Sequence, residues 1–227
     1  ALTSISTYVA TILTSTATIY EGTLFINNMM EFVDEKPTVV PTVEPPVIPS
    51  KGGEHTIEFV NVSFSYPGSK KKVINNVNLK LEPRDNVVLV GLNGAGKTTL
   101  IKLLTRLYDP TEGKILLDGR DIREYDTTAL YDLFGIIFQD FGKYAVNVSE
   151  NIHFGNIRKE MKEEDIRRAA EEADATDYIG RLPGGFDTPL MRIFEDDGIE
   201  LSIGQWQKLA IARAFYSDSD VLILDEP

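Results

Sequence analysis

The amino-acid sequence predicts an α/β fold. A short, continuously apolar segment, residues 87–90, runs into a glycine-rich turn at residues 91–96 and then into a helical pattern. A second apolar segment, residues 221–224, ends in two carboxylates, and a helical stretch at residues 162–216 precedes it. Short apolar strands that alternate with helices are typical of a parallel sheet buried between helices. The sequence therefore assigns both apolar segments to one such sheet.

Composition argues against several classes of protein. The chain has 227 residues, enough for one sizeable domain or for one domain with an additional element. Its net charge of −12 argues against a nucleic-acid-binding protein, which normally carries a basic face. It has no cysteine and only two histidines, His55 and His153. A disulfide framework, a thiolate metal site, a histidine-based zinc centre and a Ser-His-Asp arrangement are therefore not expected.

Residues 1–33 are predicted to form a helix, because apolar residues recur there at three-to-four spacing. The segment has no run of eighteen apolar residues, so it does not by itself indicate a membrane span, and it lacks the features of a signal peptide. Two interpretations remain open: an amphipathic helix that packs on another element, or the end of a longer helix. The apolar positions are Ile5, Tyr8, Val9, Ile12, Leu13, Ala17, Tyr20 and Leu24.

Residues 34–54 are predicted to form an extended linker. Each proline fixes φ and lacks a backbone N–H, so neither a helix nor a central strand can run through this segment. A linker rich in proline is semi-rigid. The prolines are Pro37, Pro41, Pro45, Pro46 and Pro49.

The remaining residues, 55–227, contain both strand and helix patterns. Val60, Val62, Phe64 and Tyr66 alternate with polar residues, as in a half-buried strand. Further strands are predicted at residues 73–81, 87–90, 114–117, 135–138 and 221–224, and helices at residues 97–107, 162–182 and 203–216.

The segment "GLNGAGKTT" fits the pattern G-x-x-x-x-G-K-[ST] of a phosphate-binding loop. Its glycines let the backbone wrap a phosphate so that N–H groups point inward, and the following helix adds the positive end of its dipole. Lys97 is expected to reach the terminal phosphates, and the Thr98 hydroxyl is expected to ligate Mg²⁺. The predicted nucleotide-binding loop comprises Gly91, Leu92, Asn93, Gly94, Ala95, Gly96, Lys97, Thr98 and Thr99.

The carboxylates after residues 221–224 supply what such a nucleotide site needs. This strand is expected beside the strand that precedes the glycine-rich turn, so that Asp225 lies at the carboxyl edge of the sheet, where ligands collect. Asp225 is predicted to contact Mg²⁺, and Glu226 to polarise the attacking water. Gln139 can reach the metal or the water from its loop, although an amide there is also a commonplace polar residue. With Lys97, Glu226 and Gln139 form the predicted catalytic set.

The segment "LSIGQWQK" opens the helix that leads to the last strand. Ser202 followed three residues later by Gln205 fits a capping box, which needs no ligand. A helix start with Ser202, Gly204 and exposed N–H groups is also suited to bind an anion. Because the chain's own nucleotide is assigned to the glycine-rich loop, a second anion site suggests a two-fold dimer in which another copy presents its nucleotide here.

Four motifs, "GLNGAGKTT", "FQDF", "LSIGQ" and "VLILDEP", follow one another as in the nucleotide-binding domain of ABC transporters, which residues 55–227 resemble. The segments "SENIHFGN" and "RLPGGFDTPL" resemble stretches of the exporter branch. By the same resemblance, "VSFSYPG" implies that Tyr66 stacks on adenine, although Tyr66 also fits a core position. The family signature is usually L-S-G-G-Q, and Ile203 departs from it here.

The resemblance implies a P-loop NTPase core of the α/β class with a mixed sheet, an N-terminal antiparallel β subdomain, an N-terminal helix and an inserted α-helical subdomain at about residues 140–216. It implies that residues 1–33 are the end of the last transmembrane helix of a membrane domain, residues 34–54 a linker, and residues 55–227 the ATP-binding domain. ATP and Mg²⁺ are the implied cofactors. The implied partners are a second nucleotide-binding domain, identical or different, and the protein's own transmembrane domain, at the cytoplasmic face of the cell membrane.

The implied function is ATP hydrolysis coupled to the export of an unidentified substrate. Two alternatives remain open: a soluble ABC-type ATPase without transport, and a non-catalytic nucleotide-binding module. The family continues beyond the equivalent of Pro227 with a dimer-contact loop and a histidine that touches the γ-phosphate. The chain is therefore expected to be a fragment that hydrolyses ATP weakly or not at all.

Overall fold

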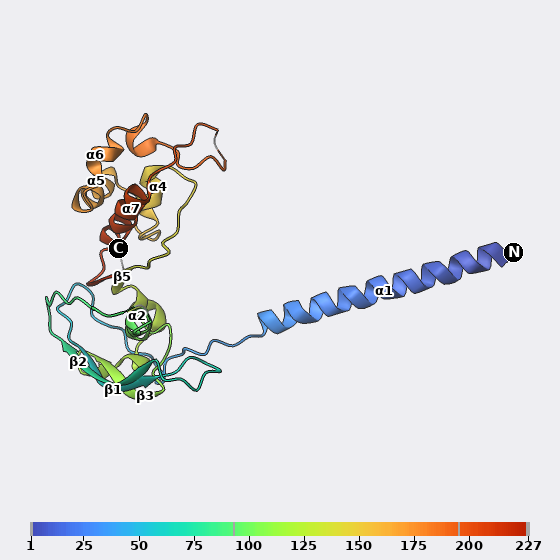
Figure 1. The fold of residues 1–227 in the computed structure, drawn as a ribbon, viewed down its shortest axis with the longest axis horizontal. Helices are drawn as coiled ribbons and strands as arrows, with labels where there is room; N and C mark the ends of the chain where they lie inside the picture. Colours follow the sequence, from blue (N-terminus) through green and yellow to red (C-terminus); the bar gives the residue numbers. More distant parts are fainter. Residues whose placement is uncertain (1, 93, 195, 226–227) are drawn as a thin grey trace. The chain divides into compact units, whose positions relative to one another are not determined.

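The chain divides into two compact units, residues 1–38 and residues 39–227. The structure is a computed structural model that describes residues 2–92, 94–194 and 196–225. The first unit is built around one helix, and the second holds the strands and the other described helices (Figure 1).

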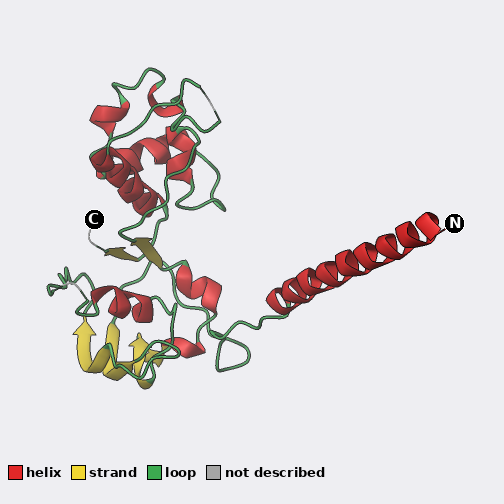
Figure 2. Cartoon of the chain, turned by 45° about the vertical axis from the view of Figure 1, so that its right-hand side comes forward, coloured by secondary structure: helices red, strands yellow, loops and turns green. Residues whose placement is uncertain are grey.

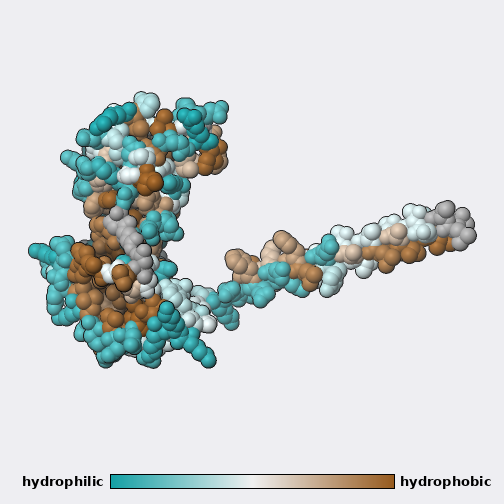
Figure 3. Space-filling view, in the orientation of Figure 1, coloured by the Kyte–Doolittle hydropathy of each residue, from teal (hydrophilic) through white to brown (hydrophobic). Residues whose placement is uncertain are grey.

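Helix α1 (Leu2–Val33) confirms the predicted N-terminal helix. From residue 5 onward its side chains, including the apolar ones, are exposed in the structure (Figure 3). Several threonine hydroxyls donate to a carbonyl one turn earlier, as Thr16 does to Ile12 at 2.8 Å, so these polar groups are satisfied without water. By length and composition alone, Ile5–Val33 is long and apolar enough to cross a membrane.

The second unit contains a four-stranded antiparallel sheet with the strand order β2-β1-β3-β4. Figure 1 labels its first three strands, β2, β1 and β3. Alternate side chains of β1, such as Ile57 and Phe59, are buried, which is the expected pattern for a sheet with one face on a core. A register shift between Phe59 and Val62 marks a bulge, after which the burial pattern is no longer strictly alternating. The elements are β1 (Ile57–Phe64), β2 (Ile74–Leu81), β3 (Glu112–Leu117), β4 (Arg120–Asp121), the 3₁₀ helix η1 (Ile122–Glu124) and α3 (Thr127–Tyr131).

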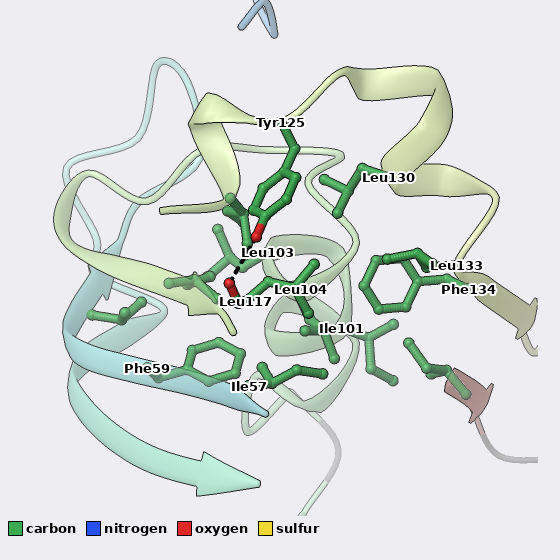
Figure 4. Close-up of a cluster of buried hydrophobic side chains, with 14 of the residues drawn as sticks. Ile57, Phe59, Ile101, Leu103, Leu104, Leu117, Tyr125, Leu130, Leu133 and Phe134 are labelled. Carbon is green, nitrogen blue, oxygen red and sulfur yellow. Dashed lines mark hydrogen bonds between the residues drawn. The ribbon is translucent and has the colours of Figure 1, made fainter. Parts of the chain in front are cut away.

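Helix α2 (Lys97–Leu104) contributes its apolar side to the core of this sheet. Ile101 belongs to the same buried cluster as Phe59 of β1 (Figure 4). Tyr125 enters the cluster from above α2 in this view, and its hydroxyl donates to the Leu117 carbonyl at 3.0 Å. The antiparallel sheet and α2 therefore share one core.

Two further strands, β5 (Phe134–Ile137) and β6 (Val221–Leu224), pair in parallel. Since parallel strands point the same way, their carboxyl ends meet at one edge. Helix α7 (Ile203–Tyr216) packs Ala210 and Ala214 against β5. The parallel and antiparallel strands thus form two separate sheets among the described residues.

Most of the remaining helices gather in the predicted helical subdomain (Figure 2). This subdomain has a core of its own, in which Trp206 of α7 is buried. The helix predicted at residues 162–182 is in fact two helices. Asp174 adopts a left-handed φ of 52° just after the first of them, a conformation that Asp tolerates better than most residues and that cannot continue a helix. The additional elements are α4 (Val148–His153), α5 (Glu163–Glu172), α6 (Thr176–Ile179) and the 3₁₀ helix η2 (Gly185–Asp187).

The strand predicted at residues 87–90 is wrong: these residues are irregular and exposed, with 82% of Val88 and 91% of Val90 accessible. The prediction that the last strand lies beside them is also wrong, because β6 pairs with β5. A strand forms where a neighbour accepts and donates its backbone hydrogen bonds. No described strand does so for residues 87–90.

The proline-rich segment lies against the second unit from Val40 onward. Arg106, which is fully buried shortly after α2, donates from Nη2 to the Val40 carbonyl at 2.6 Å and from Nη1 to the Tyr125 carbonyl at 3.2 Å. Farther along, the Val47 N–H donates to the Glu124 carbonyl at 2.9 Å. From Val40 onward, the segment is therefore anchored on the part of the unit that contains α2.

Candidate functional site

Two glycines of the glycine-rich turn have left-handed backbones, and a helix follows directly, which are features that suit a phosphate-binding loop. Gly94 and Gly96 adopt φ angles of 80° and 97°, in the left-handed region that favours glycine. Helix α2 begins at Lys97, directly after Gly96, and no described side chain caps its first turn. A helix start of this kind attracts an anion through its N–H groups and its dipole.

Lys97 is half-buried, and its ammonium group points back to the beginning of the loop. Its Nζ donates to the Gly91 carbonyl at 2.9 Å and to the Leu92 carbonyl at 3.5 Å. An ammonium group held there can exchange carbonyl oxygens for the stronger, charged oxygens of a phosphate. Thr98, the predicted Mg²⁺ ligand, is exposed, whereas Thr99 is buried.

Replacing Gly96 with alanine is expected to strain the loop. The added Cβ would lie 2.8 Å from Ile74 Cδ1 and 3.3 Å from the Val73 carbonyl oxygen, at a φ of 97°. The left-handed backbone costs an L-residue about 1–2 kcal/mol. Displacing the buried Ile74 adds to this cost, so we expect Gly96→Ala to lower the free energy of unfolding, measured with urea, by more than the backbone cost alone. Gly94→Ala is the control, because its φ is 80° but nothing lies within 4 Å. Equal losses in the two variants would contradict the contact with Ile74.

Tyr66, predicted to stack on adenine, lies just beyond the end of β1 and is half-buried. Its hydroxyl is 3.0 Å from the Thr99 Oγ1 in α2. Its ring makes edge contacts with Phe64 and Tyr108, whose centroids are 5.0 and 5.4 Å away. These contacts put Tyr66 beside the helix of the glycine-rich loop and also in the packed core, so stacking on adenine stays a prediction.

The parallel sheet brings Gln139 and Asp225 to one edge. The Asp225 N–H donates at 2.9 Å to the carbonyl of Ile137, the last residue of β5, and Gln139 follows two positions later. Asp225 is only 6% exposed, whereas Gln139 is exposed. The predicted general base Glu226 and the loop residue Asn93 lie outside the described residues.

The oxygen donors of this region suit Mg²⁺. In residues 2–92, 94–194 and 196–225, no group of three or more His, Cys, Asp or Glu side chains could hold a metal ion. Mg²⁺ usually keeps several waters and is held by one or two carboxylates together with substrate phosphates. The Asp225 carboxylate and the Thr98 hydroxyl are oxygen groups of the kind that Mg²⁺ takes, and their joint role as its ligands stays a prediction.

The start of α7 contains the predicted capping box. The Ser202 Oγ accepts the Gln205 N–H at 3.3 Å, and the Gln205 Oε1 accepts the Ser202 N–H at 2.8 Å. Tyr178 of α6 donates to the Gln205 carbonyl at 3.2 Å, and burial raises the pKa of Tyr178 to about 12, so this donor stays protonated. Ile203 is 76% exposed, and Gly204 is exposed as well. This helix start belongs to the core of the helical subdomain rather than to the core that contains α2.

Arg213 is a candidate functional residue that the sequence motifs miss. Its guanidinium lies 4.7 Å from the centroid of the Tyr144 ring, and it donates to the carbonyls of Asn151 and Gly142. Burial lowers the pKa of Arg213 to about 10, which leaves it charged at neutral pH. Arg213 therefore ties α7 to the loop that follows Gln139. The signal in the sequence is a basic residue within the apolar run "LAIARAF", since a charge at such a position needs a buried partner.

Comparison with known proteins identifies relatives over nearly the whole chain. The family profile described as ABC transporter matches residues 74–227. The subtilin transport ATP-binding protein SpaT of Bacillus subtilis is 38% identical over 216 residues, which are 95% of this chain and 34% of that protein. The ATP-dependent lipid A-core flippase of Salmonella typhimurium is 42% identical over 170 residues, which are 75% of this chain and 28% of the flippase.

A solved structure of a bacterial Atm1-family ABC exporter with ATP bound matches with a TM-score of 0.80 and 31% identity. The match covers 92% of this chain and 35% of the exporter, so the chain spans about a third of the length of these relatives. The family match includes the glycine-rich loop, Gln139, the start of α7 and Asp225. The chain therefore belongs to the ABC transporter family and has the P-loop α/β fold of its ATP-binding domain.

Proposed function

We propose that this chain is the ATP-binding and ATP-hydrolysing part of an ABC exporter, in which hydrolysis is coupled to moving a substrate across a membrane. The observation that carries the proposal is the glycine-rich loop. Gly94 and Gly96 have left-handed backbones, and α2 begins at the next residue, Lys97. A loop of this sequence and geometry binds nucleotide phosphates through its backbone N–H groups.

Residues 91–99 would hold the triphosphate of ATP. Lys97 would neutralise the terminal phosphates, and the position of its ammonium group within the loop supports this role. Tyr66 would stack its ring on adenine, and its hydrogen-bonding distance to Thr99 supports a position next to the loop helix. The charged contact of Lys97 and the aromatic contact of Tyr66 are both of the kind that orients a nucleotide.

Thr98, Gln139 and Asp225 would hold Mg²⁺, which when bound neutralises the charge that develops on the transferred phosphoryl group. Glu226, directly after Asp225, would take the proton from the attacking water. The hydrogen bond from the Asp225 N–H to the Ile137 carbonyl supports a joint role for this edge. Through it, the segment that carries Gln139 and the segment that carries Asp225 are held in register.

A second nucleotide-binding domain would complete the site. Ser202, Gly204 and Gln205 would face the nucleotide of the partner domain, so that ATP lies in the joint between two copies or two related chains. The exposure of the α7 start supports this role. At Ile203 the family usually has glycine, and the larger side chain would restrict how closely the start of α7 can approach the partner's nucleotide.

Helix α1 would be the end of the last transmembrane helix, and residues 34–54 would link it to the ATP-binding domain at the cytoplasmic face of the cell membrane. Its length and composition support this assignment, as does the anchoring of Val40 by Arg106. Among the relatives are a flippase and an exporter by name. These observations favour a transport-coupled ATPase over a soluble ABC-type ATPase.

The main test is ATP turnover in the exporter that carries this sequence. We expect Glu226→Gln to leave ATP binding intact and to lower hydrolysis by about 10²–10⁴-fold, which is the usual contribution of a general base. The variant should accumulate an ATP-bound dimer, measured by size-exclusion chromatography with radiolabelled ATP.

Glu172→Gln is the matched control for this variant, because Glu172 is an exposed carboxylate at the end of α5. It should hydrolyse ATP at the rate of the unmodified exporter. Unchanged turnover in Glu226→Gln would contradict the proposed mechanism. The chain of residues 1–227 by itself is expected to bind ATP weakly and to turn over negligibly.

A further inference from the structure

His55 is a buried titratable side chain that the proposed mechanism does not use. Its side chain is 2% exposed, and each ring nitrogen faces a carboxylate. Nδ1 lies 2.8 Å from the Asp118 Oδ2, and Nε2 lies 3.1 Å from the Asp220 Oδ2. These three residues form what we call the histidine clip.

The histidine clip joins three segments of the second unit. His55 lies just before β1, Asp118 follows β3, and Asp220 precedes β6. Two backbone groups reinforce it: the Thr56 N–H donates to the Asp118 Oδ1 at 2.8 Å, and the Gly52 N–H donates to the Asp220 Oδ2 at 2.8 Å. The clip therefore connects the antiparallel sheet, the parallel sheet and the end of the proline-rich segment.

The geometry of the clip requires a protonated ring. A neutral imidazole has one N–H, whereas ionised carboxylates only accept hydrogen bonds, so only the imidazolium satisfies both Asp118 and Asp220. Burial opposes this charge, but the hydrogen bonds and charges of the two carboxylates outweigh it and raise the pKa of His55 above 6.5. Asp118 and Asp220 are the charged groups that face the ring. On its own segment, the neighbouring Glu54 pairs with Arg84 at 2.5 Å.

We propose that His55 is a proton-dependent positioning residue, whose imidazolium fastens β6 to the antiparallel sheet and thereby fixes Asp225. Asp220 is the last residue before β6, and Asp225 is the first residue after it. Loss of the proton leaves one N–H for two carboxylates, so one of the two contacts opens. The effect on nucleotide binding rests on the proposed function, whereas the clip itself does not.

The stabilising effect of the clip is expected to disappear as the pH rises. Because the pKa of His55 is higher in the folded chain than its ordinary value of 6.5, the clip contributes fully below that value. Its contribution is lost as the pH rises through the raised pKa. The stability difference between the unmodified chain and His55→Gln should therefore shrink with increasing pH.

The first test is an NMR titration of the full chain with the substitution His153→Gln. His153 is the only other histidine and faces the Tyr216 hydroxyl at 3.1 Å rather than a carboxylate. Its removal leaves one imidazole to follow, and we expect a midpoint for His55 above 6.5. The additional substitution Asp220→Asn should lower this midpoint. A midpoint at or below 6.5, or no change with Asp220→Asn, overturns the proposal.

The second test measures amide exchange and nucleotide binding. After correction for intrinsic rates, the Gly52 and Thr56 amides should exchange faster above the titration midpoint, and protection that does not change with pH overturns the clip. The affinity for Mg²⁺-ATP should fall severalfold across the same range, and His55→Gln should remove this fall. An identical fall in His55→Gln overturns the positioning role. If the exporter that carries this sequence binds no ATP at any pH, the proposed function fails while the exchange result still tests the clip.

Discussion

Replacing Lys97 with alanine is expected to weaken Mg²⁺-ATP binding by roughly 10- to 100-fold. A hydrogen bond to a charged group contributes about 1.5–3 kcal/mol, and each 1.4 kcal/mol or so corresponds to tenfold in affinity. The ammonium group lies within the loop, 2.9 Å from the Gly91 carbonyl, so the variant would lose the charge that is proposed to bind the phosphates. Isothermal titration calorimetry of the exporter that carries this sequence measures the effect.

Lys102→Ala is the matched control for the Lys97 variant. Lys102 lies in the last turn of the same helix, α2. Its replacement therefore removes the same charge at a distance from the glycine-rich loop. We expect it to bind ATP like the unmodified protein. If both variants lost affinity equally, the effect would be one of net charge rather than of the loop. Full affinity in Lys97→Ala would contradict the assignment of the loop to the phosphates.

Elements whose boundaries are set by nearby residues could be predicted from the sequence. The predicted bounds of α7 and β6 agree with the structure, because the Ser202–Gln205 capping box and Asp225 mark where these elements begin and end. A similar box, Asn147 with Glu150, caps α4, and this signal could have revealed that helix. The prediction of a strand at residues 87–90 was wrong, because a strand depends on a partner strand that an apolar run does not specify.

The residues of the candidate site also differ in whether the sequence alone could predict them. The glycine-rich loop and Asp225 are recognisable because their chemistry depends on a few consecutive residues. The contacts of Arg213 and His55 are not, because Arg213 binds Asn151 across 62 positions of the chain, and His55 meets Asp220 across 165. Such long-range hydrogen bonds arise from the tertiary fold rather than from local propensity.

Replacing Trp206 with alanine is expected to lower the free energy of unfolding by about 3–5 kcal/mol, the usual cost of removing a large buried aromatic side chain. Trp206 is 1% exposed and belongs to the core of the helical subdomain. It lies in the first turn of α7, where its N–H donates to the Ser202 carbonyl at 3.0 Å. Urea unfolding followed by circular dichroism measures the loss, since the variant removes the chain's single tryptophan.

Two control variants separate cavity formation from a general loss of apolar surface. Trp206→Phe keeps part of the ring volume and should lose less stability than alanine, because the cost follows the cavity that remains. Phe194→Ala removes a ring that is 80% exposed and should change the free energy by less than about 0.5 kcal/mol. A loss below about 1 kcal/mol in Trp206→Ala would contradict the packed core. Because the cavity would open beneath the first turn of α7, this variant should also impair ATP-dependent pairing of two domains, an effect that Phe194→Ala should not share.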